Sequence, residues 1–339
     1  PSDPSPTAPK PPAVAAGPWP VYTQWPFDAA EAKRRQEETA KALGIPVEDA
    51  LDLGNGLKMP LVLLPAGEFL MGSPDKPSAS ELCRLYGGDS PTYEDERPRH
   101  RVRLTKPFYL GACEVTRGEF AEFVRQTRYK THFENEGKAW GLKDGEWGYQ
   151  EGYCWRNPGF PQTDRHPALY LHPRDVHAFC TWAGTKTGRR VTLPTEAQWE
   201  YACRAGSDGL WPWGDREEDT KGRANVSWLD KDATWSRAKS TFRGFRGAAD
   251  GHLFTAPVGS FEPNAFGLRD MIGNVWEWVG DWYGEDYYAR SPVDDPPGPA
   301  EGTVRVRRGG SWHTWPLYAR VAFRNWNSPQ TRYVLVGFR

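Results

Sequence analysis

The chain has 339 residues, enough for one large domain or two modest ones, and no run approaches the roughly 18 consecutive apolar residues that a membrane-spanning helix requires. Its net charge of −1 gives no general attraction for nucleic acid or acidic membranes, and the basic cluster of Arg305, Arg307 and Arg308 reads as a solvated strand end. The 17 tryptophans and 35 glycines indicate irregular, tightly turned segments packed by large rings, with little regular helix or strand.

The beginning of the chain differs in composition from the rest. Residues 1–26 are rich in Pro, Ala and Ser, which is typical of a linker after a signal peptide or lipid anchor. Residues 27–55 are predicted to form a helical extension, in which Asp28 caps a helix that Gly44 ends. Residues 56–339 are predicted to form one domain.

Short strands and three helices are predicted in the first half of that domain. Residues 61–73 read as two strands broken at a Pro–Ala–Gly turn. Capping boxes open helices at Thr116 and Thr195, and residues 174–186 carry apolar side chains at helical spacing. From residue 211 onward turn residues recur every few positions, so we expect mainly irregular structure there. The five cysteines form no CxxC or other metal-ligand spacing, which indicates neither a disulfide framework nor a zinc site.

Six ordered blocks of sequence carry a resemblance: LLPAGEFLMGS, PFYLGACEVTRGEF, LPTEAQWEYACRAG, TAPVGSFEPNAFGLRDMIGNVWEW, RVRRGGSW and the terminal GFR. Together they resemble the sulfatase-modifying-factor family, which includes the formylglycine-generating enzyme, the C-terminal domain of ergothioneine sulfoxide synthases and a pyoverdine-maturation enzyme. The resemblance implies a mixed α+β fold, the formylglycine-generating-enzyme variant of the C-type lectin fold, rich in irregular structure. It leaves the activity open, because one fold hosts several chemistries.

The resemblance also implies two structural calcium sites. The first maps to Asn225, the carbonyl of Val226, Asp250 and the carbonyl of His252. The second maps to Asp270, Gly273, Val275 and Glu277. Carboxylate and carbonyl oxygens suit a hard cation, and a glycine in the second set permits a tight backbone curl. We therefore expect calcium as a structural cofactor that holds loops lacking regular hydrogen bonds.

A copper site is not expected. In the formylglycine-generating members, two cysteines shortly after the GGS motif bind copper, because Cu(I) requires soft thiolate ligands. Counting from Ser311, the corresponding positions hold Thr314 and Ala319, and no cysteine follows Cys203. Formylglycine synthesis is therefore unlikely on chemical grounds. Cys180 and Cys203 match disulfide positions of relatives but lack the usual C-terminal partners, so they are predicted to be buried thiols.

The last third of the chain supplies the candidate ligand-binding residues. Those matching the family's substrate cleft are Trp276, Ser311 and Tyr318. The full set adds neighbouring side chains, mostly aromatic: Trp312, His313, Thr314, Trp315, Leu317, Phe323, Trp326 and Tyr333. Core packing is the alternative role for these rings, and we expect about half of them to be exposed enough to bind anything.

Three functions stay open. The first is a calcium-stabilised module that binds an unknown protein or small molecule at this aromatic surface, with no nucleic-acid partner and no membrane span. The second is a repurposed oxidase, metal-dependent or metal-free, like the pyoverdine-maturation or sulfoxide-synthase members, in which His313 could take a new role. The third is structural assembly. The linker-like start and the calcium sites favour an extracytoplasmic or secreted location, with a cytoplasmic one left open.

A variable protein of a diversity-generating retroelement is one specific form of the binding hypothesis. In such proteins the same lectin-like fold ends in a variable segment that begins at GGSW and closes at GFR. Nine tail positions hold residues reachable from an AAC codon by changes in its first two bases: His313, Thr314, Leu317, Tyr318, Phe323, Ser328, Tyr333, Val334 and Leu335. Trp315 and Trp326 do not belong to that set.

Overall fold

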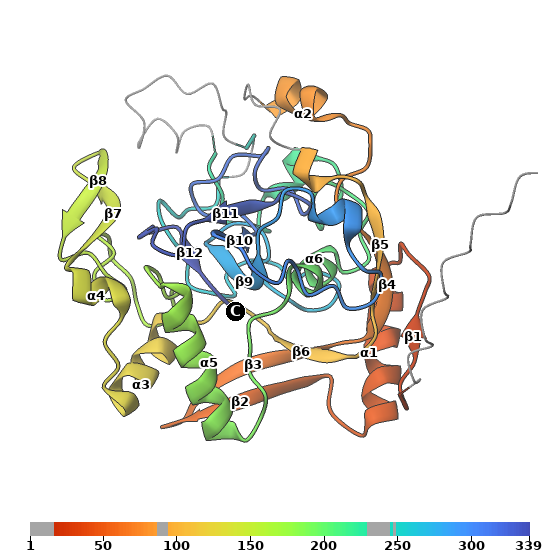
Figure 1. The fold of residues 1–339 in the computed structure, drawn as a ribbon, viewed down its shortest axis with the longest axis horizontal. Helices are drawn as coiled ribbons and strands as arrows, with labels where there is room; N and C mark the ends of the chain where they lie inside the picture. Colours follow the sequence, from red (N-terminus) through yellow and green to blue (C-terminus); the bar gives the residue numbers. More distant parts are fainter. Residues whose placement is uncertain (1–16, 87–93, 229–244, 247–248) are drawn as a thin grey trace, which may run out of the picture.

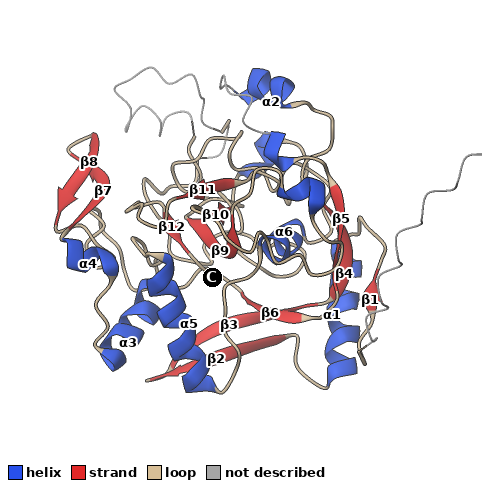
Figure 2. Ribbon diagram, in the orientation of Figure 1, coloured by secondary structure: helices blue, strands red, loops and turns tan. Residues whose placement is uncertain are grey.

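The computed structural model describes residues 17–86, 94–228, 245–246 and 249–339, and within them the fold is mixed α+β, as predicted, with long irregular stretches (Figure 2). The elements are, in chain order, β1 (Val21–Tyr22), α1 (Ala29–Leu43), β2 (Glu48–Gly54), β3 (Leu57–Leu64), β4 (Ala66–Met71), α2 (Ala79–Tyr86), η1 (Glu94–Glu96), β5 (His100–Leu104), β6 (Phe108–Gly111), α3 (Arg117–Thr127), α4 (His132–Glu136), β7 (Lys138–Lys143), β8 (Glu146–Glu151), α5 (Pro173–Thr187), α6 (Glu196–Arg204), η2 (Glu217–Thr220), β9 (Trp276–Trp282), η3 (Tyr287–Arg290), β10 (Arg305–Arg308), β11 (Asn325–Asn327) and β12 (Val336–Gly337). No helix among the described residues combines the length and the apolar composition that a bilayer crossing needs.

The described strands form four small sheets, one of them central. Strands β2, β3 and β6 lie along the base of the molecule, α1 stands with β1, β4 and β5 at one side, and the β7–β8 hairpin projects from the other (Figure 1). The central sheet has the order β11-β10-β9-β12 and is built from the last quarter of the chain. Its middle strands β9 and β10 run antiparallel, whereas the two-residue strand β12 runs parallel to β9.

The N-terminal helix begins and ends as predicted. The Asp28 side chain accepts a hydrogen bond from a backbone N–H of the first turn, and Gly44 ends the helix in the left-handed region at φ 65°. Gln36 on this helix donates to the carbonyls of Leu63 and Phe266, at 2.9 and 3.0 Å. The helix is therefore fastened to the domain by a buried polar side chain and not only by an apolar stripe.

Two parts of the predicted N-terminal organisation need correction. Residues 48–54 are strand β2 and not part of a helical extension, since they pair antiparallel with β3. Residues 17–26 are packed and not linker: the Trp19 indole N–H donates to the Thr105 carbonyl at 3.1 Å, and β1 pairs with β4. Residues 1–16 of the predicted linker lie outside the described residues.

The helix predictions within the domain are confirmed. Capping boxes at Thr116 and Thr195 open α3 and α6, and α5 covers the predicted segment 174–186. Cys180 and Cys203 are buried free thiols, as expected, and burial raises the pKa of Cys180 to about 12. These thiols fill core volume and are poor nucleophiles at neutral pH.

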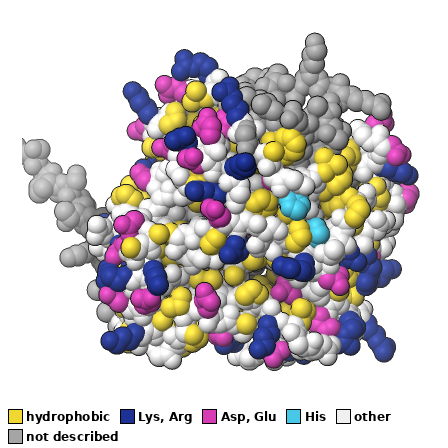
Figure 3. All heavy atoms as spheres, turned by 180° about the vertical axis from the view of Figure 1, so that it is seen from behind, with side chains coloured by type: hydrophobic (Ala, Val, Ile, Leu, Met, Phe, Trp, Pro, Cys, Tyr) yellow, Lys and Arg dark blue, Asp and Glu magenta, His cyan; other side chains and the backbone are white. Residues whose placement is uncertain are grey.

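Buried arginines tie the C-terminal segments to core carboxylates. The pairs are Arg308 with Glu200, Arg320 with Glu96, Arg324 with Glu196 and Arg339 with Glu277. The reading of the basic cluster as a solvated strand end is therefore wrong for two of its members, because Arg307 is 7% exposed and Arg308 is fully buried. On the outer surface, acidic and basic side chains alternate, with no large field of one sign on the face shown in Figure 3.

Candidate functional site

The two positions that hold cysteines in formylglycine-generating enzymes lie beside each other here. Both adjoin Gly310: a Cβ added there would stand 3.1 Å from Thr314 Cγ2 and 3.5 Å from Ala319 Cα. The Thr314 hydroxyl oxygen accepts the Ser311 backbone N–H at 2.8 Å and lies 3.0 Å from the Ser311 hydroxyl. This place therefore holds one methyl group and one hydroxyl that is already hydrogen-bonded, and no thiol.

Beside it, eight side chains form a closed series of contacts, which we call the aromatic circuit. Its members, in order, are Trp147, Tyr333, Arg307, Trp276, Phe323, Tyr318, Trp315 and His313, which contacts Trp147 again. Successive members lie 4.9–6.4 Å apart, measured between ring centroids or from the guanidinium carbon to a ring centroid. The His313 backbone N–H donates to the Ser311 hydroxyl at 3.4 Å, which joins the circuit to the former cysteine positions.

Burial divides the circuit into two tiers. The half-buried members are Trp147, His313, Trp315, Tyr318 and Tyr333. The other three are buried, with 7% exposure for Arg307, 4% for Trp276 and 7% for Phe323. Solvent therefore meets four aromatic rings and an imidazole first, and the guanidinium lies in the deeper tier.

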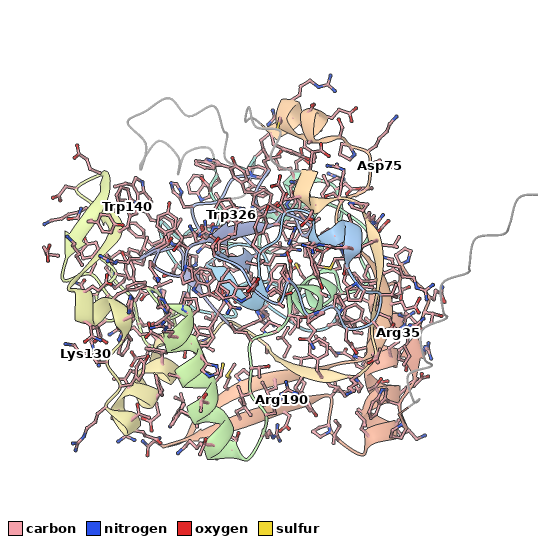
Figure 4. All side chains as sticks on the ribbon, viewed as in Figure 1. Arg35, Asp75, Lys130, Trp140, Arg190 and Trp326 are labelled. Carbon is pink, nitrogen blue, oxygen red and sulfur yellow. The ribbon has the colours of Figure 1, made fainter. Side chains whose placement is uncertain are left out.

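The predicted ligand set is only partly brought together. Trp312 and Leu317 are fully buried, and Trp312 packs on Phe254 at 5.2 Å between ring centroids, so these two belong to the core. Ser311 and Thr314 are also buried, hydrogen-bonded to each other. Trp326, on β11 (Figure 4), is 46% exposed, and its ring contact is with Tyr283, which is not a member of the circuit. The predicted aromatic surface is thus a two-tiered group of rings, to which only part of the predicted set belongs.

The same burial restricts the positions that could vary as an interaction surface. Five of the nine candidate positions are buried: Thr314, Leu317, Phe323, Val334 and Leu335. The remaining four are half-buried or exposed: His313, Tyr318, Ser328 and Tyr333. Substitution at a buried position repacks the core, so free variation is confined to the second group.

Two members of the circuit were missed by sequence reasoning. Trp147 comes from β8, in a hairpin that projects from the domain, and only the tertiary fold brings it to the tail. Arg307 was misread because basic residues in a row usually meet water. Its guanidinium instead lies over the rings of Trp276 and Tyr333, and burial lowers its pKa to about 10. The period of two along a strand could have separated these arginines, because residues 305 and 307 lie on one face of β10 and Arg308, which pairs with Glu200, lies on the other.

The residues mapped to the first calcium site are close together. Asp250 accepts the backbone N–H groups of Val226 and His252, at 3.2 and 2.8 Å. The Asn225 side chain is buried and donates to the Phe254 carbonyl at 2.8 Å. The loop that carries Asp250 therefore folds back onto the Asn225–Val226 segment, which puts carboxylate, amide and carbonyl oxygens in one neighbourhood.

At the second mapped site the two carboxylates differ. Asp270 is buried at φ 57°; its Oδ2 accepts the Gly259 N–H at 2.6 Å, while its Oδ1 has no hydrogen-bond partner among the described residues. Glu277 accepts from the Trp199 indole at 2.8 Å and from Arg339 at 2.6 and 2.7 Å. The charge of Glu277 is thus already balanced, and that of Asp270 is not.

Glu114 is a further carboxylate that sequence reasoning missed. Both of its oxygens are buried and accept no hydrogen bond from a described N–H group or hydroxyl, and its carboxyl lies within hydrogen-bonding reach of the Asp270 carboxyl. Burial, and next the charge of Asp270, raise its pKa well above the ordinary value. Gly273 and Val275, whose carbonyl oxygens were mapped as calcium ligands, lie in the same buried segment as Asp270. A Cβ added to Gly273 would collide with the Asn225 carbonyl, so the two mapped calcium sites adjoin. The carboxylates of Asp270 and Glu114 repel each other in a buried place, which is costly, and a cation between them would offset that cost.

Within the described ranges, no group of three or more His, Cys, Asp or Glu side chains is arranged to hold a metal ion. A cation at either calcium position would therefore depend on amide and carbonyl oxygens as well as on carboxylates. That donor set is typical of calcium and unlike that of copper or iron.

Comparison with known proteins identifies the family. Residues 56–339 match the family described as the sulfatase-modifying factor enzyme 1-like domain. The chain is 37% identical to the formylglycine-generating enzyme of Streptomyces coelicolor over 306 residues, which cover 82% of this chain and 87% of that protein. It is 30% identical to the inactive C-alpha-formylglycine-generating enzyme 2 of Bos taurus over 318 residues, 85% of this chain and 90% of that one.

Solved structures agree on the fold. PvdO from Pseudomonas aeruginosa superposes with a TM-score of 0.63 at 30% identity, over 86% of this chain and 96% of that one. Variable protein 1 of Treponema denticola superposes with a TM-score of 0.60 at 22% identity, over 86% and 98%, a likeness that shows the fold alone. By its sequence blocks, its fold and these relatives, the chain belongs to the sulfatase-modifying factor enzyme 1-like family.

Proposed function

We propose that this chain is a ligand-binding member of its family that does not make formylglycine. The observation that carries the proposal is the pair of adjacent residues Thr314 and Ala319, which adjoin Gly310 where copper-binding members hold two cysteines. Neither a methyl group nor a hydroxyl can replace a thiolate toward Cu(I). The relatives include both a formylglycine-generating enzyme and a protein named as its inactive counterpart, so loss of activity within this family has a precedent.

The aromatic circuit supports binding as the retained role. Its half-buried rings offer apolar faces with polar edges, which favours contact with a ligand that is partly apolar. The deeper tier lies beneath these rings and not flush with them. This arrangement favours a narrow ligand, such as a small molecule or the end of a chain, over a flat protein surface.

The test of lost activity uses a cysteine peptide that a formylglycine-generating relative converts. The chain, supplied with Cu(I) and oxygen, should leave the peptide unchanged by mass spectrometry. The double variant Thr314→Cys, Ala319→Cys should bind Cu(I) at least about 100-fold more tightly than the parent in competition with a chelator, because it restores two thiolates. A Thr314→Ser, Ala319→Ser variant is the matched control without thiols. Conversion of the peptide by the parent chain would overturn the proposal.

We also propose structural calcium at the two mapped sites, with Glu114 near the second. The unpartnered oxygens of Asp270 and Glu114 support this at one site, and the folded-back Asp250 loop supports it at the other. A ligand present at 100 times its dissociation constant stabilises a fold by about 2.7 kcal/mol. Chelation should therefore lower the melting temperature, and Ca²⁺ should restore it better than Mg²⁺.

Separate variants distinguish the two calcium sites. Asp250→Asn should remove one binding event in calorimetry, and Asp270→Asn should remove the other. Elemental analysis that finds no calcium, together with a melting temperature insensitive to chelator, would contradict both sites.

The oxidase alternative retains one supporting observation, the likeness to PvdO at 30% identity. Stoichiometric iron or copper in the native protein, lost in His313→Ala, would favour it over the binding role.

A further inference from the structure

Arg307 is buried in the aromatic circuit, and no described carboxylate pairs with it. Its Nε and Nη1 have no hydrogen-bond partner in the structure as described, and the side chain is 7% exposed. Its neighbours are ring faces: the guanidinium carbon lies 4.9 Å from the Trp276 centroid and 5.6 Å from the Tyr333 centroid. Cation–π contacts offset only part of the cost of burying a charge, which is large when no anion is nearby.

The other buried arginines of the C-terminal half show what is missing. Each of the five, namely Arg204, Arg308, Arg320, Arg324 and Arg339, is paired with a glutamate, at distances no longer than 2.9 Å. Arg307 shares their burial and lacks the anion. The guanidinium adjoins the solvent-facing tier of the circuit, because it contacts the half-buried ring of Tyr333.

We propose that the aromatic circuit binds a carboxylate, held by the Arg307 guanidinium, with the apolar body of the ligand against the surrounding rings. The inference rests on the proposed binding function and names the chemistry of its ligand. A planar guanidinium matches a planar carboxylate, with two parallel N–H···O hydrogen bonds. One arginine balances one negative charge, so a monoanion fits better than a phosphate dianion. The ligand is then a small carboxylic acid or the C-terminus of a chain.

Two probes of the same shape test this idea. 4-Fluorophenylacetate carries the carboxylate, and 4-fluorophenylacetamide replaces it with a neutral amide; fluorine NMR measures the affinity of each. A hydrogen-bonded charge pair predicts that the acid binds about tenfold more tightly, or better, than the amide. Arg307→Met should bring that ratio to about one while the amide still binds, since the rings are unchanged.

Arg305→Met is the matched control. Arg305 lies on the same face of the same strand, over the Trp282 ring and hydrogen-bonded to the Gly280 carbonyl, outside the circuit. This variant should keep the parent's preference for the acid. A peptide ending in phenylalanine, compared as free acid and as amide, tests whether the ligand is the end of a chain. Tighter binding of the acid than of its amide, for 4-fluorophenylacetate or for the peptide, supports the proposal.

The outcomes separate the two levels of the argument. Equal affinity of the parent for acid and amide would overturn the carboxylate site and leave the binding function standing. Failure of every probe to bind would overturn both. If Arg307→Met lowers the melting temperature as far as Arg308→Met does, Arg307 is a structural residue and the proposal fails. If Arg307→Met does not fold, Arg307→Lys should keep the charge and lose most of the acid preference, and a full preference in that variant would contradict the two-bond geometry.

Discussion

Arg307 and Arg308 are neighbours on β10, both buried, yet they lie in opposite surroundings. Arg308 donates to the carbonyls of Val321 and Phe323, at 2.9 and 2.8 Å, and pairs with Glu200. Arg307 faces aromatic rings and has no such partner among the described residues. Successive side chains of a strand point to opposite faces of the sheet, so one guanidinium lies in the ionic network and the other in the aromatic circuit. Burial therefore does not reveal the role of a charged side chain; its partners do.

The largest expected effect comes from breaking the ionic side. Arg308→Met leaves the buried Glu200 carboxylate with one arginine among the described residues, Arg204, and it removes the donor to the tail carbonyls. Breaking a buried pair in this way costs about 3–5 kcal/mol of the free energy of unfolding. Urea denaturation of Arg308→Met and Arg307→Met checks the contrast. If the two variants lose the same free energy of unfolding to within about 1 kcal/mol, the distinction between the ionic and the aromatic face of β10 is wrong.

A smaller effect concerns Asp95, which lies next to the ionic network beside Arg324. Burial raises the pKa of Asp95 to about 6, partly opposed by the charge of Arg324 and by the Tyr283 hydroxyl, which donates to Asp95 at 2.8 Å. The unfolded chain releases this proton near pH 4, so the free energy of unfolding falls as the pH rises from about 4 to about 6 and stays lower above that. A shift of about 2 pKa units corresponds to at most about 3 kcal/mol.

Asp95→Asn should remove that fall. The variant should equal the parent near pH 4 and exceed it in stability above pH 6, measured by urea denaturation across the range. Asp286→Asn, at an exposed carboxylate, is the control and should leave the pH profile unchanged. A variant that loses stability equally at every pH would show that Asp95 acts only through its hydrogen bond.

The smallest effect is expected at the ring outside the circuit. Trp326 is 46% exposed and contacts Tyr283 at 5.5 Å between centroids, so Trp326→Ala should cost about 1 kcal/mol or less. It should leave the affinity for 4-fluorophenylacetate unchanged, whereas Tyr333→Ala should lower it. A drop of more than about threefold for Trp326→Ala would place the ligand elsewhere on the tail.

Local signals in the sequence were sufficient for the regular elements. The capping box at Thr116 and the Asp28–Gly44 helix are each set by residues within a few positions of one another, and the structure confirms them. The family blocks predicted the fold and the adjacency of residues 314 and 319. The pairing of β2 with β3 was missed although its signal is local: Asn55 and Gly56, both at positive φ, join the two strands, and an Asn–Gly pair between strands is typical of a hairpin.

The candidate site was predicted less completely, because its residues come from distant parts of the chain. Trp276 and Tyr318 were identified through the family's cleft, but Trp147 reaches them from a hairpin more than a hundred residues away in sequence. Arg307 looks like any surface arginine until its neighbours are known. Glu114 carries no local mark of a cation site, since its meaning depends on Asp270, which lies far along the chain.

The closed order of the aromatic circuit limits how this protein can evolve a new specificity. Each member touches two others, a ring or the Arg307 guanidinium, so a replacement at one position loosens both neighbours at once. Trp147 and Trp276 belong to separate stretches of the gene from the tail that supplies the remaining rings. Substitution confined to the tail can therefore change most of the circuit, but it leaves Trp147 in the half-buried tier and Trp276 in the buried tier as fixed neighbours of whatever the tail presents.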